Sequence, residues 1–360
     1  MGQDLKYGRN SAVSSPLVTS HPKITVLMPV YNAESHLHEA IRSIIKQSFS
    51  DFEFLIINDG STDRSVEIVR SYRDPRINLV HNEKNLGLIA TLNRGIHISR
   101  GEYIARMDSD DISLPRRFET QVKAMDKHGD WGICGSWVRI LGGPDSGTVQ
   151  CYPTKSKYLL CELLFDSPIA HPSIMIRKET IFKSNEYYDE NFKHAEDYDL
   201  WCRLAKITSM SNIPKILLNY RIHGSQTGSK HSAEQKSAAN RIRFRQITQL
   251  DIDPSEEEFQ THKIISTLRH EKLSENFVDA SEHWFMKLIT ANSKKKIFPE
   301  PEFSKTIGLR WLLICNLSTG GVGWKMKRYF DTPLKHVTCI DWSRLVKSYL
   351  MNRFPSRSSG

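Results

Sequence analysis

The chain has few cysteines and no long apolar run. Its six cysteines lie far apart, at positions 134, 151, 161, 202, 315 and 339, without a Cys-x-x-Cys pair. This spacing indicates neither a disulfide framework nor a zinc ribbon, and a reducing compartment suits it best. No stretch approaches the ~18 to 20 apolar residues that a membrane-spanning helix needs. The longest candidate is the short run from Trp311 to Cys315, so we expect no integral membrane protein.

Two kinds of short signal are also missing. Residues 1–21 contain no apolar stretch of the kind found in signal peptides, and Lys6 stands where a myristoylation signal needs Ser or Thr. We expect this segment to be a disordered tail. No Gly-x-Gly-x-x-Gly follows any expected strand, which disfavours a dinucleotide-binding protein.

What is present is typical of a soluble globular chain. The 360 residues are 39% hydrophobic and 25% charged, which excludes disorder or collagen as a description of the whole chain. The net charge of +9 is concentrated at one end, because residues 301–360 hold ten Lys or Arg against three Asp or Glu. Such an end indicates contact with an anionic surface, either nucleic acid or acidic lipid.

Strands and helices are expected to alternate between residues 22 and 228. Short apolar runs predict strands at 24–30, 52–58, 77–81 and 103–107, and apolar positions at helical spacing predict helices at 33–48, 63–73 and 88–99. Asn32 is placed to cap the first of these helices. The alternation predicts an α/β fold with a mostly parallel sheet and helices on both faces. Residues 229–360, interrupted by prolines, predict a basic and mainly α-helical C-terminal region.

Polar clusters follow three of the expected strands, where a parallel sheet binds its ligands. Asp108, Asp110 and Asp111 come directly after a buried strand. Mutual repulsion there favours a bound cation, and oxygen ligands suit Mg²⁺ or Mn²⁺. A helix N-cap is the alternative reading. Asp59 lies in the segment Asn58 to Asp63. The alternative is that the polar residues of this segment only form a turn and cap the helix that follows.

Several motifs in sequence order resemble glycosyltransferase family 2, a group of inverting enzymes with the GT-A fold. They are PVYNAE (29–34), NDGSTD (58–63), NLG and NRG (85–87 and 93–95), ARMDSDD (105–111), LPRR (114–117) and AEDYDLW (195–201). The resemblance covers residues 22–228, which we take as a nucleotide-sugar-binding catalytic domain, and leaves the C-terminal third outside. One departure is Asn58, where family members usually carry Asp.

The resemblance assigns roles to individual residues. Asp110 is implied as a metal ligand, Asp108 as a contact of the ribose or the metal, and Asp59 as the acceptor for a pyrimidine N–H. Asp197 is implied as the general base, which takes the proton of an acceptor hydroxyl. The alternative for Asp197 is that it has no catalytic role, because the helix macrodipole favours an acidic residue at any helix N-terminus. Pro29 and Tyr31 would form a stacking wall for the base.

Three further residues are weaker candidates. Arg221 could pair with the diphosphate, and similar enzymes often place a histidine like His223 near the metal. Arg106 is a charge within an expected strand, so it either reaches the nucleotide or satisfies a neighbouring carboxylate. His171 is expected to be a hydrogen-bonded structural residue.

We therefore expect a metal-dependent glycosyltransferase, either a hexosyl- or an N-acetylhexosaminyl-transferase. The expected donor is a UDP-sugar, the cofactor Mn²⁺ or Mg²⁺, and the acceptor a saccharide or a lipid-linked saccharide in surface polysaccharide or lipid-linked oligosaccharide assembly. The expected location is cytoplasmic, peripheral on the inner membrane face. The residues that suit a lipid interface there are Trp311, Leu312, Leu313, Ile314, Trp324 and Trp342. The alternative is that these residues form the core of a helical subdomain. Two alternatives stay open: a nucleic-acid-binding protein that uses the basic aromatic end, and a transferase-like scaffold without activity.

Overall fold

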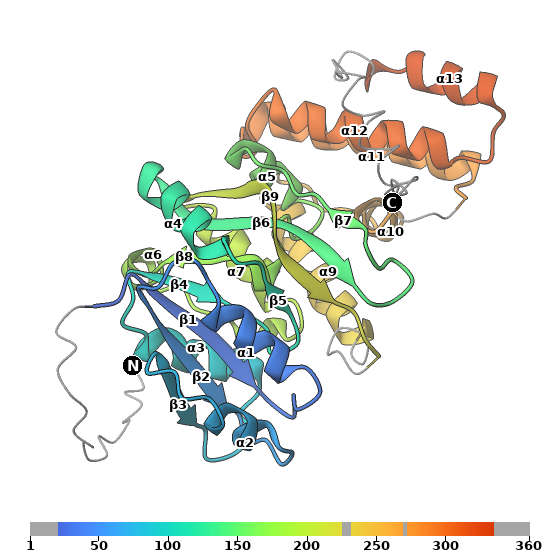
Figure 1. Ribbon diagram of the computed structural model, residues 1–360. Helices are drawn as coiled ribbons and strands as arrows, with labels where there is room; N and C mark the ends of the chain where they lie inside the picture. Colours follow the sequence, from blue (N-terminus) through green and yellow to red (C-terminus); the bar gives the residue numbers. More distant parts are fainter. Residues whose placement is uncertain (1–20, 225–231, 269–271, 335–360) are drawn as a thin grey trace.

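The computed structural model describes residues 21–224, 232–268 and 272–334. Figure 1 shows a curled β-sheet covered by helices and, at one side of it, a group of C-terminal helices. Residues 1–20 of the expected disordered tail and Trp342 lie outside the described residues.

Four parallel strands form the first half of the sheet. They are β1 (Ile24–Val30), β2 (Phe52–Asn58), β3 (Ile77–His81) and β4 (Tyr103–Arg106), in the spatial order β3-β2-β1-β4. Every residue of β1 and β2 is buried, as expected for strands covered on both faces. The sequence prediction for these strands is confirmed, and their carboxyl ends meet at one edge of the sheet.

Helices cover both faces of these strands. Helices α1 (Leu37–Ile45), α2 (Ser65–Arg70) and α4 (Arg117–Lys127) share one apolar core with one face, and α3 (Leu88–Ile98) and α7 (Glu196–Leu204) share another core with the opposite face. The prediction that Asn32 caps α1 is wrong. Asn32 has a φ of 47°, and its side chain accepts a hydrogen bond from the backbone of Thr62, so it joins two loops instead.

Beyond β4 the sheet becomes mixed. Its order continues β4-β8-β6-β9-β5, with β8 (Met175–Arg177), β6 (Trp131–Leu141), β9 (Ser209–Arg221) and β5 (Ile112–Ser113), while β7 (Val149–Gln150) pairs with β6. β8 is antiparallel to both β4 and β6, and β6 and β9 are parallel. The short helices α5 (Ser156–Glu162) and α6 (Lys178–Ser184) flank this half. The expected α/β class is confirmed, whereas the parallel arrangement extends over only part of the sheet.

The C-terminal region is helical, as predicted, over its described residues. It consists of α9 (Ser232–Thr248), α10 (Glu256–Ser266), α11 (Glu275–Lys295), α12 (Glu302–Leu317) and α13 (Val322–Phe330), which enclose a third apolar core. α9 also contributes Ala238, Ala239 and Ile242 to the core beside α7. A domain boundary at residue 228 therefore remains a prediction.

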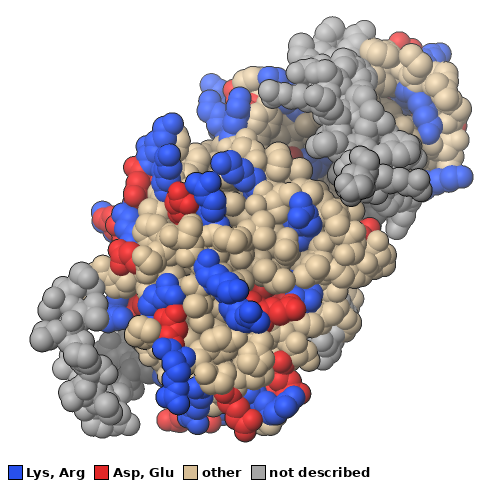
Figure 2. Space-filling model, in the orientation of Figure 1, with Lys and Arg blue, Asp and Glu red and all other residues tan. Residues whose placement is uncertain are grey.

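This third core corrects one expectation. Trp311 and Ile314, which were expected at a lipid interface, are fully buried inside the helical region, and Leu312 and Trp324 pack against the same core, whereas Leu313 is 37% exposed. For the first four of these residues the alternative, the core of a helical subdomain, is the one that the structure bears out. None of the helices that the structure describes is long and apolar enough to cross a membrane. On the face shown in Figure 2, Lys and Arg side chains lie beside Asp and Glu along the edge of the sheet region, which agrees with its nearly balanced charge in the sequence.

Candidate active site

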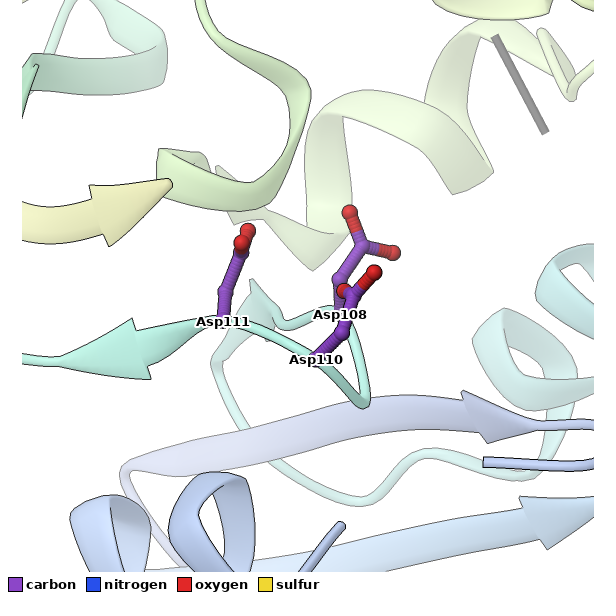
Figure 3. A group of neighbouring side chains, drawn as sticks. All are labelled: Asp108, Asp110 and Asp111. Atoms are coloured by element: carbon purple, nitrogen blue, oxygen red, sulfur yellow. The ribbon is translucent and has the colours of Figure 1, made fainter. Parts of the chain in front are cut away.

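Three aspartates gather on the loop between β4 and β5. One carboxylate oxygen each from Asp108, Asp110 and Asp111 lies within 4.8 Å of the others. Figure 3 shows the three side chains rising from the same side of the loop. The buried strand before the loop and β5 after it fix both ends, so the carboxylates are held together despite their like charges.

The electrostatics of this group fit a divalent cation. Burial raises the pKa of Asp111 well above its ordinary value, and the charges of Asp108 and Asp110 raise it further. Burial also raises the pKa of Asp108. The Oδ2 atom of Asp111 is buried and has no hydrogen-bond partner among the described residues. An oxygen-only group with an unsatisfied buried atom is suited to Mg²⁺ or Mn²⁺.

Arg106, at the end of β4, pairs with this group. Its side chain is buried, and its Nη1 atom donates to Asp108 at 2.5 Å. Burial raises the pKa of Glu196 and Asp197 on α7, and the charge of Arg106 opposes this rise. Arg106 thus satisfies a neighbouring carboxylate, the second of the two predicted possibilities, and lies within electrostatic reach of both acidic groups. Contact with a nucleotide stays a prediction.

The end of β9 supports the aspartate loop from the other side. The backbone N–H of Arg221 donates to Asp111 Oδ1 at 2.8 Å, and its Nε atom donates to the carbonyl of Asp110 at 2.7 Å. The same guanidinium pairs with Glu39 of α1. His223 Nε2 lies 2.9 Å from Asp110 Oδ2. The two residues that the sequence placed at the end of the first domain therefore both meet the loop.

Asp59 lies buried beneath the loop that follows β3. Its Oδ1 atom accepts hydrogen bonds from Asn82 Nδ2 at 2.6 Å and from the N–H of Leu86 at 2.8 Å, and its Oδ2 accepts from the N–H of Gly87 at 2.9 Å. Gly60 has a φ of +74°, and a Cβ there would lie 2.7 Å from the backbone nitrogen of Asn85. The NDG turn and the NLG loop are thus in close contact. Sequence reasoning did not single out Asn82.

The two residues expected to stack on a base differ in exposure. Tyr31, just after β1, is 51% exposed, so its ring is accessible at the carboxyl end of the strand. Pro29 is buried within β1. The role of each as a stacking residue stays a prediction.

The first turn of α7 carries the other acidic pair. Leu200, Trp201 and Leu204 are fully buried and fix the helix against the sheet. Burial raises the pKa of Asp197 to about 6, against the opposing effects of the Tyr198 N–H and Arg106. Burial, together with the neighbouring Asp197 charge, raises the pKa of Glu196. A carboxylate with a pKa close to neutral is well suited to accept a proton.

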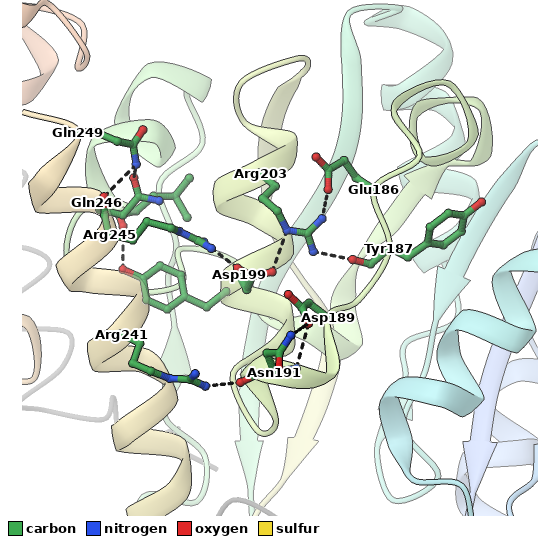
Figure 4. Close-up of polar contacts among 12 residues, drawn as sticks. Glu186, Tyr187, Asp189, Asn191, Asp199, Arg203, Arg241, Arg245, Gln246 and Gln249 are labelled. Carbon is green, nitrogen blue, oxygen red and sulfur yellow. Dashed lines mark hydrogen bonds and ion pairs between the residues drawn. The ribbon is translucent and has the colours of Figure 1, made fainter. Parts of the chain in front are cut away.

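A second ion-pair network, which the sequence did not reveal, holds α7 in place. Asp199 is fully buried, and its carboxylate accepts from Arg203 Nε at 2.8 Å and lies 2.6 Å from Arg245 of α9. Arg203 also contacts Glu186 and donates to the carbonyl of Tyr187. Figure 4 shows Asp199 between the two arginines. The network joins α7 to α9 and to the loop that precedes α7. Asp199 and Arg203 are four residues apart on one helix, whereas Arg245 is distant from both in the sequence.

His171 is a half-buried, hydrogen-bonded structural histidine, as expected. Its Nε2 lies 2.8 Å from the hydroxyl of Tyr188, and its ring packs edge-on against Trp201. Burial lowers the pKa of His171 well below its ordinary value, and the charge of Arg106 adds to the effect. The imidazole is therefore neutral near neutral pH.

Known proteins match this chain in sequence. The model of the family "Glycosyl transferase family 2" matches residues 25–184. An uncharacterized glycosyltransferase of Haemophilus influenzae is 35% identical over 239 residues, which cover 63% of this chain and 74% of the relative. Another, from Methanocaldococcus jannaschii, is 36% identical over 208 residues, which cover 56% of this chain and 71% of the relative.

Solved structures share the fold. S. aureus TarS (residues 1–349), crystallised in complex with UDP-GlcNAc, superposes with a TM-score of 0.53 at 19% identity, covering 86% of this chain and 88% of that one. This likeness shows a GT-A-like fold. Taken with the matches in sequence, it leads to one conclusion: the chain belongs to glycosyltransferase family 2.

Proposed function

We propose that this chain is an inverting glycosyltransferase that transfers a sugar from a nucleotide sugar to an acceptor hydroxyl. The observation that carries the proposal is that the charge of Arg106 acts on two acidic groups. One is the three aspartates after β4, and the other is Asp197, whose pKa is raised. One group suits a diphosphate with its cation, and the other suits proton removal.

Asp108, Asp110 and Asp111 are the residues that would hold Mn²⁺ or Mg²⁺, with His223 beside Asp110. A divalent ion bound there would stabilise the negative charge of a leaving diphosphate. Arg221 fixes the loop through its contacts with Asp110 and Asp111, and Arg106 offsets the charge of Asp108. These contacts keep the carboxylates in place before any ligand binds.

The base of the nucleotide is proposed to lie at the carboxyl ends of β1 and β2. Asp59 Oδ2 accepts one hydrogen bond from Gly87 and can accept a second, from a pyrimidine N–H. The exposed ring of Tyr31 offers a face on which a base can stack. TarS, which shares the fold, binds UDP-GlcNAc, so UDP-sugars are the first donors to test.

Asp197 is proposed as the general base. An acceptor hydroxyl has a pKa far above 7, so its attack on the anomeric carbon requires a positioned group that takes the proton as the new bond forms. At neutral pH a carboxyl with a pKa of about 6 is mostly ionised and can do so. Direct attack of this kind inverts the anomeric configuration. The acceptor is proposed to be a saccharide or lipid-linked saccharide.

A donor screen tests the proposal. Released nucleoside diphosphate would be measured for a panel of UDP-, GDP- and dTDP-sugars, with Mn²⁺, with Mg²⁺ and with a chelator. We expect one UDP-sugar to be turned over only in the presence of metal. The Asp110→Ala protein serves as the control. Turnover that neither the chelator nor Asp110→Ala reduces would contradict the assignment of the aspartate group.

A further inference from the structure

The loop that follows α5, residues 163–170, is held in place by helices of the C-terminal region. Arg243 of α9 donates from Nε to the carbonyl of Phe165 at 2.6 Å. His262 of α10 has its Nε2 atom 3.0 Å from the carbonyl of Leu164, and its ring stacks on the ring of Phe165. Both side chains are buried. The loop is therefore positioned by residues that follow it by 78 and 98 places in the sequence.

A third helix, α12, holds the beginning of the same loop, and Figure 1 shows α5 close to α12. The guanidinium of Arg310 donates to the two carboxylate oxygens of Glu162, the last residue of α5, at 3.1 and 2.5 Å. It also lies 3.8 Å from the centre of the Phe165 ring. A bidentate pair of this kind fixes direction as well as distance. The C-terminal region, which lies beyond the residues that the family model matches, thus supports this loop.

The supported loop presents one carboxylate, Asp166, to solvent. Its side chain is 58% exposed, and its Oδ1 atom lies 3.3 Å from Nη2 of the buried Arg243. Burial nevertheless raises the pKa of Asp166, and the charge of Arg243 opposes this rise. Protein therefore surrounds a carboxylate that water still reaches. Such a group can accept further hydrogen bonds from a ligand.

The loop lies beside the first turn of α7. The hydroxyl of Tyr198, the residue after Asp197, donates to the carbonyl of Leu163 at 2.7 Å. This hydrogen bond joins the helix that carries the proposed base to the loop that carries Asp166. The two carboxylates also interact, because the charge of Asp166 adds to the burial that raises the pKa of Asp197.

A tyrosine from a second segment lies near the same two carboxylates. Asn212 of β9 joins this segment to the loop, because its Nδ2 atom donates to the carbonyls of Pro153 and Pro168 at 2.8 and 3.0 Å. Tyr152, next to Pro153, is half-buried. Burial raises the pKa of Tyr152, and the charges of both carboxylates add to this rise. An amphipathic ring beside two hydrogen-bond acceptors is suited to contact with a sugar.

We propose that Asp166 binds one hydroxyl of the acceptor sugar and thereby decides which other hydroxyl meets Asp197. The reacting end of the acceptor is a neutral sugar, because a carboxylate on that sugar would face two negative charges. This inference rests on the proposed function, in which Asp197 is the base, and adds the class of the acceptor and the residue that selects it. The C-terminal helices act on specificity through the loop that they support.

Matched pairs of acceptors test the charge argument. Methyl glucoside and methyl glucuronide differ only at the sixth carbon, where a carboxylate replaces a hydroxymethyl group, and methyl galactoside and methyl galacturonide form a second pair. The donor is the UDP-sugar that the full chain turns over with Mn²⁺, and glycosylated product is measured near neutral pH. We expect kcat/KM for a neutral glycoside to exceed that for its uronide at least ~30-fold.

Variants separate the charge of Asp166 from its part in the fold. Asp166→Asn should narrow the neutral-to-uronide ratio at least ~5-fold, because one of two negative charges is lost, whereas a merely structural loss would slow both members of a pair alike. Asp166→Glu keeps the charge and should keep the ratio. The control is Asp279→Asn, which removes a carboxylate that is 56% exposed and pairs with Arg328 of α13. It should change neither kcat/KM nor the ratio.

Three results would overturn the inference while the proposed function stands. The first is metal-dependent turnover of the donor with neither neutral glycoside glycosylated. The second is equal kcat/KM for the two members of each pair. The third is an unchanged ratio in Asp166→Asn. If the unmodified chain turns over no UDP-sugar at all, the proposed function itself fails, and the inference falls with it.

Discussion

Replacing Asp197 by Asn should abolish transfer and at the same time stabilise the protein. The amide has nearly the same shape as the carboxylate but cannot accept the proton, so the rate of transfer should fall by the ~10² to 10⁴ typical of a lost general base. Donor binding should persist, because the aspartate group after β4 is intact. Glycosylated product, rather than released diphosphate, is the readout, since slow donor hydrolysis can survive.

The stabilisation follows from the pKa of Asp197. Folding raises this pKa from 3.8 to about 6, so the folded state binds more protons than the unfolded state between these values. Stability therefore falls as pH rises through this range, and at pH 7 the charge costs at most ~3 kcal/mol, at 1.36 kcal/mol per pKa unit. Asn removes this cost. Thermal unfolding should show a midpoint above that of the unmodified chain at pH 7 and a smaller difference at pH 4.

Asp199→Asn is the matched comparison, two residues along the same helix. It removes the buried carboxylate from Arg203 and Arg245, although Arg203 keeps Glu186 and Arg245 is 37% exposed, so this protein should be less stable by ~1 to 3 kcal/mol. The opposite signs of the two changes separate a catalytic carboxylate from a structural one. Retention of more than about a tenth of transfer by Asp197→Asn would refute the assignment of the general base.

Three further predictions follow from the site. Because Asp197 must be ionised, the transfer rate should fall about tenfold per pH unit below its pKa of about 6; a pH–rate profile that stays flat down to pH 5 would contradict this. Asp110→Ala should abolish the Mn²⁺-dependent part of UDP binding in calorimetric titration, whereas unchanged affinity would place the metal elsewhere. Gly60→Ala should destabilise the protein by at least ~1 kcal/mol in denaturant unfolding, because φ is +74° and the added Cβ would meet the backbone of Asn85.

The sequence by itself determined the parallel half of the sheet. The runs Ile24–Val30, Phe52–Asn58 and Ile77–His81 coincide with β1, β2 and β3, because continuous apolar and β-branched segments of this length are typical of buried strands. It also located the aspartate group, since carboxylates placed directly after a buried strand must lie at the sheet edge. Motif order alone identified the family.

Tertiary structure decided whatever depends on distant residues. The two-residue strands β5 and β7 and the helices α5 and α6 are too short for a periodic signal, and β8 reverses direction through pairing that the sequence does not encode locally. Asn32 was expected to cap a helix because Asn often does, but a contact with Thr62 uses its side chain instead.

The same reason explains the site and the C-terminal region. Asp199 pairs with Arg245, 46 residues away, and Asn82 meets Asp59 across a loop; neither pairing has a local sequence signal. Trp311 and Val322 are both apolar residues in a basic segment, yet one is buried and the other is 75% exposed. Amino-acid type sets how much burial would stabilise a side chain, whereas helix packing decides which side chains are buried.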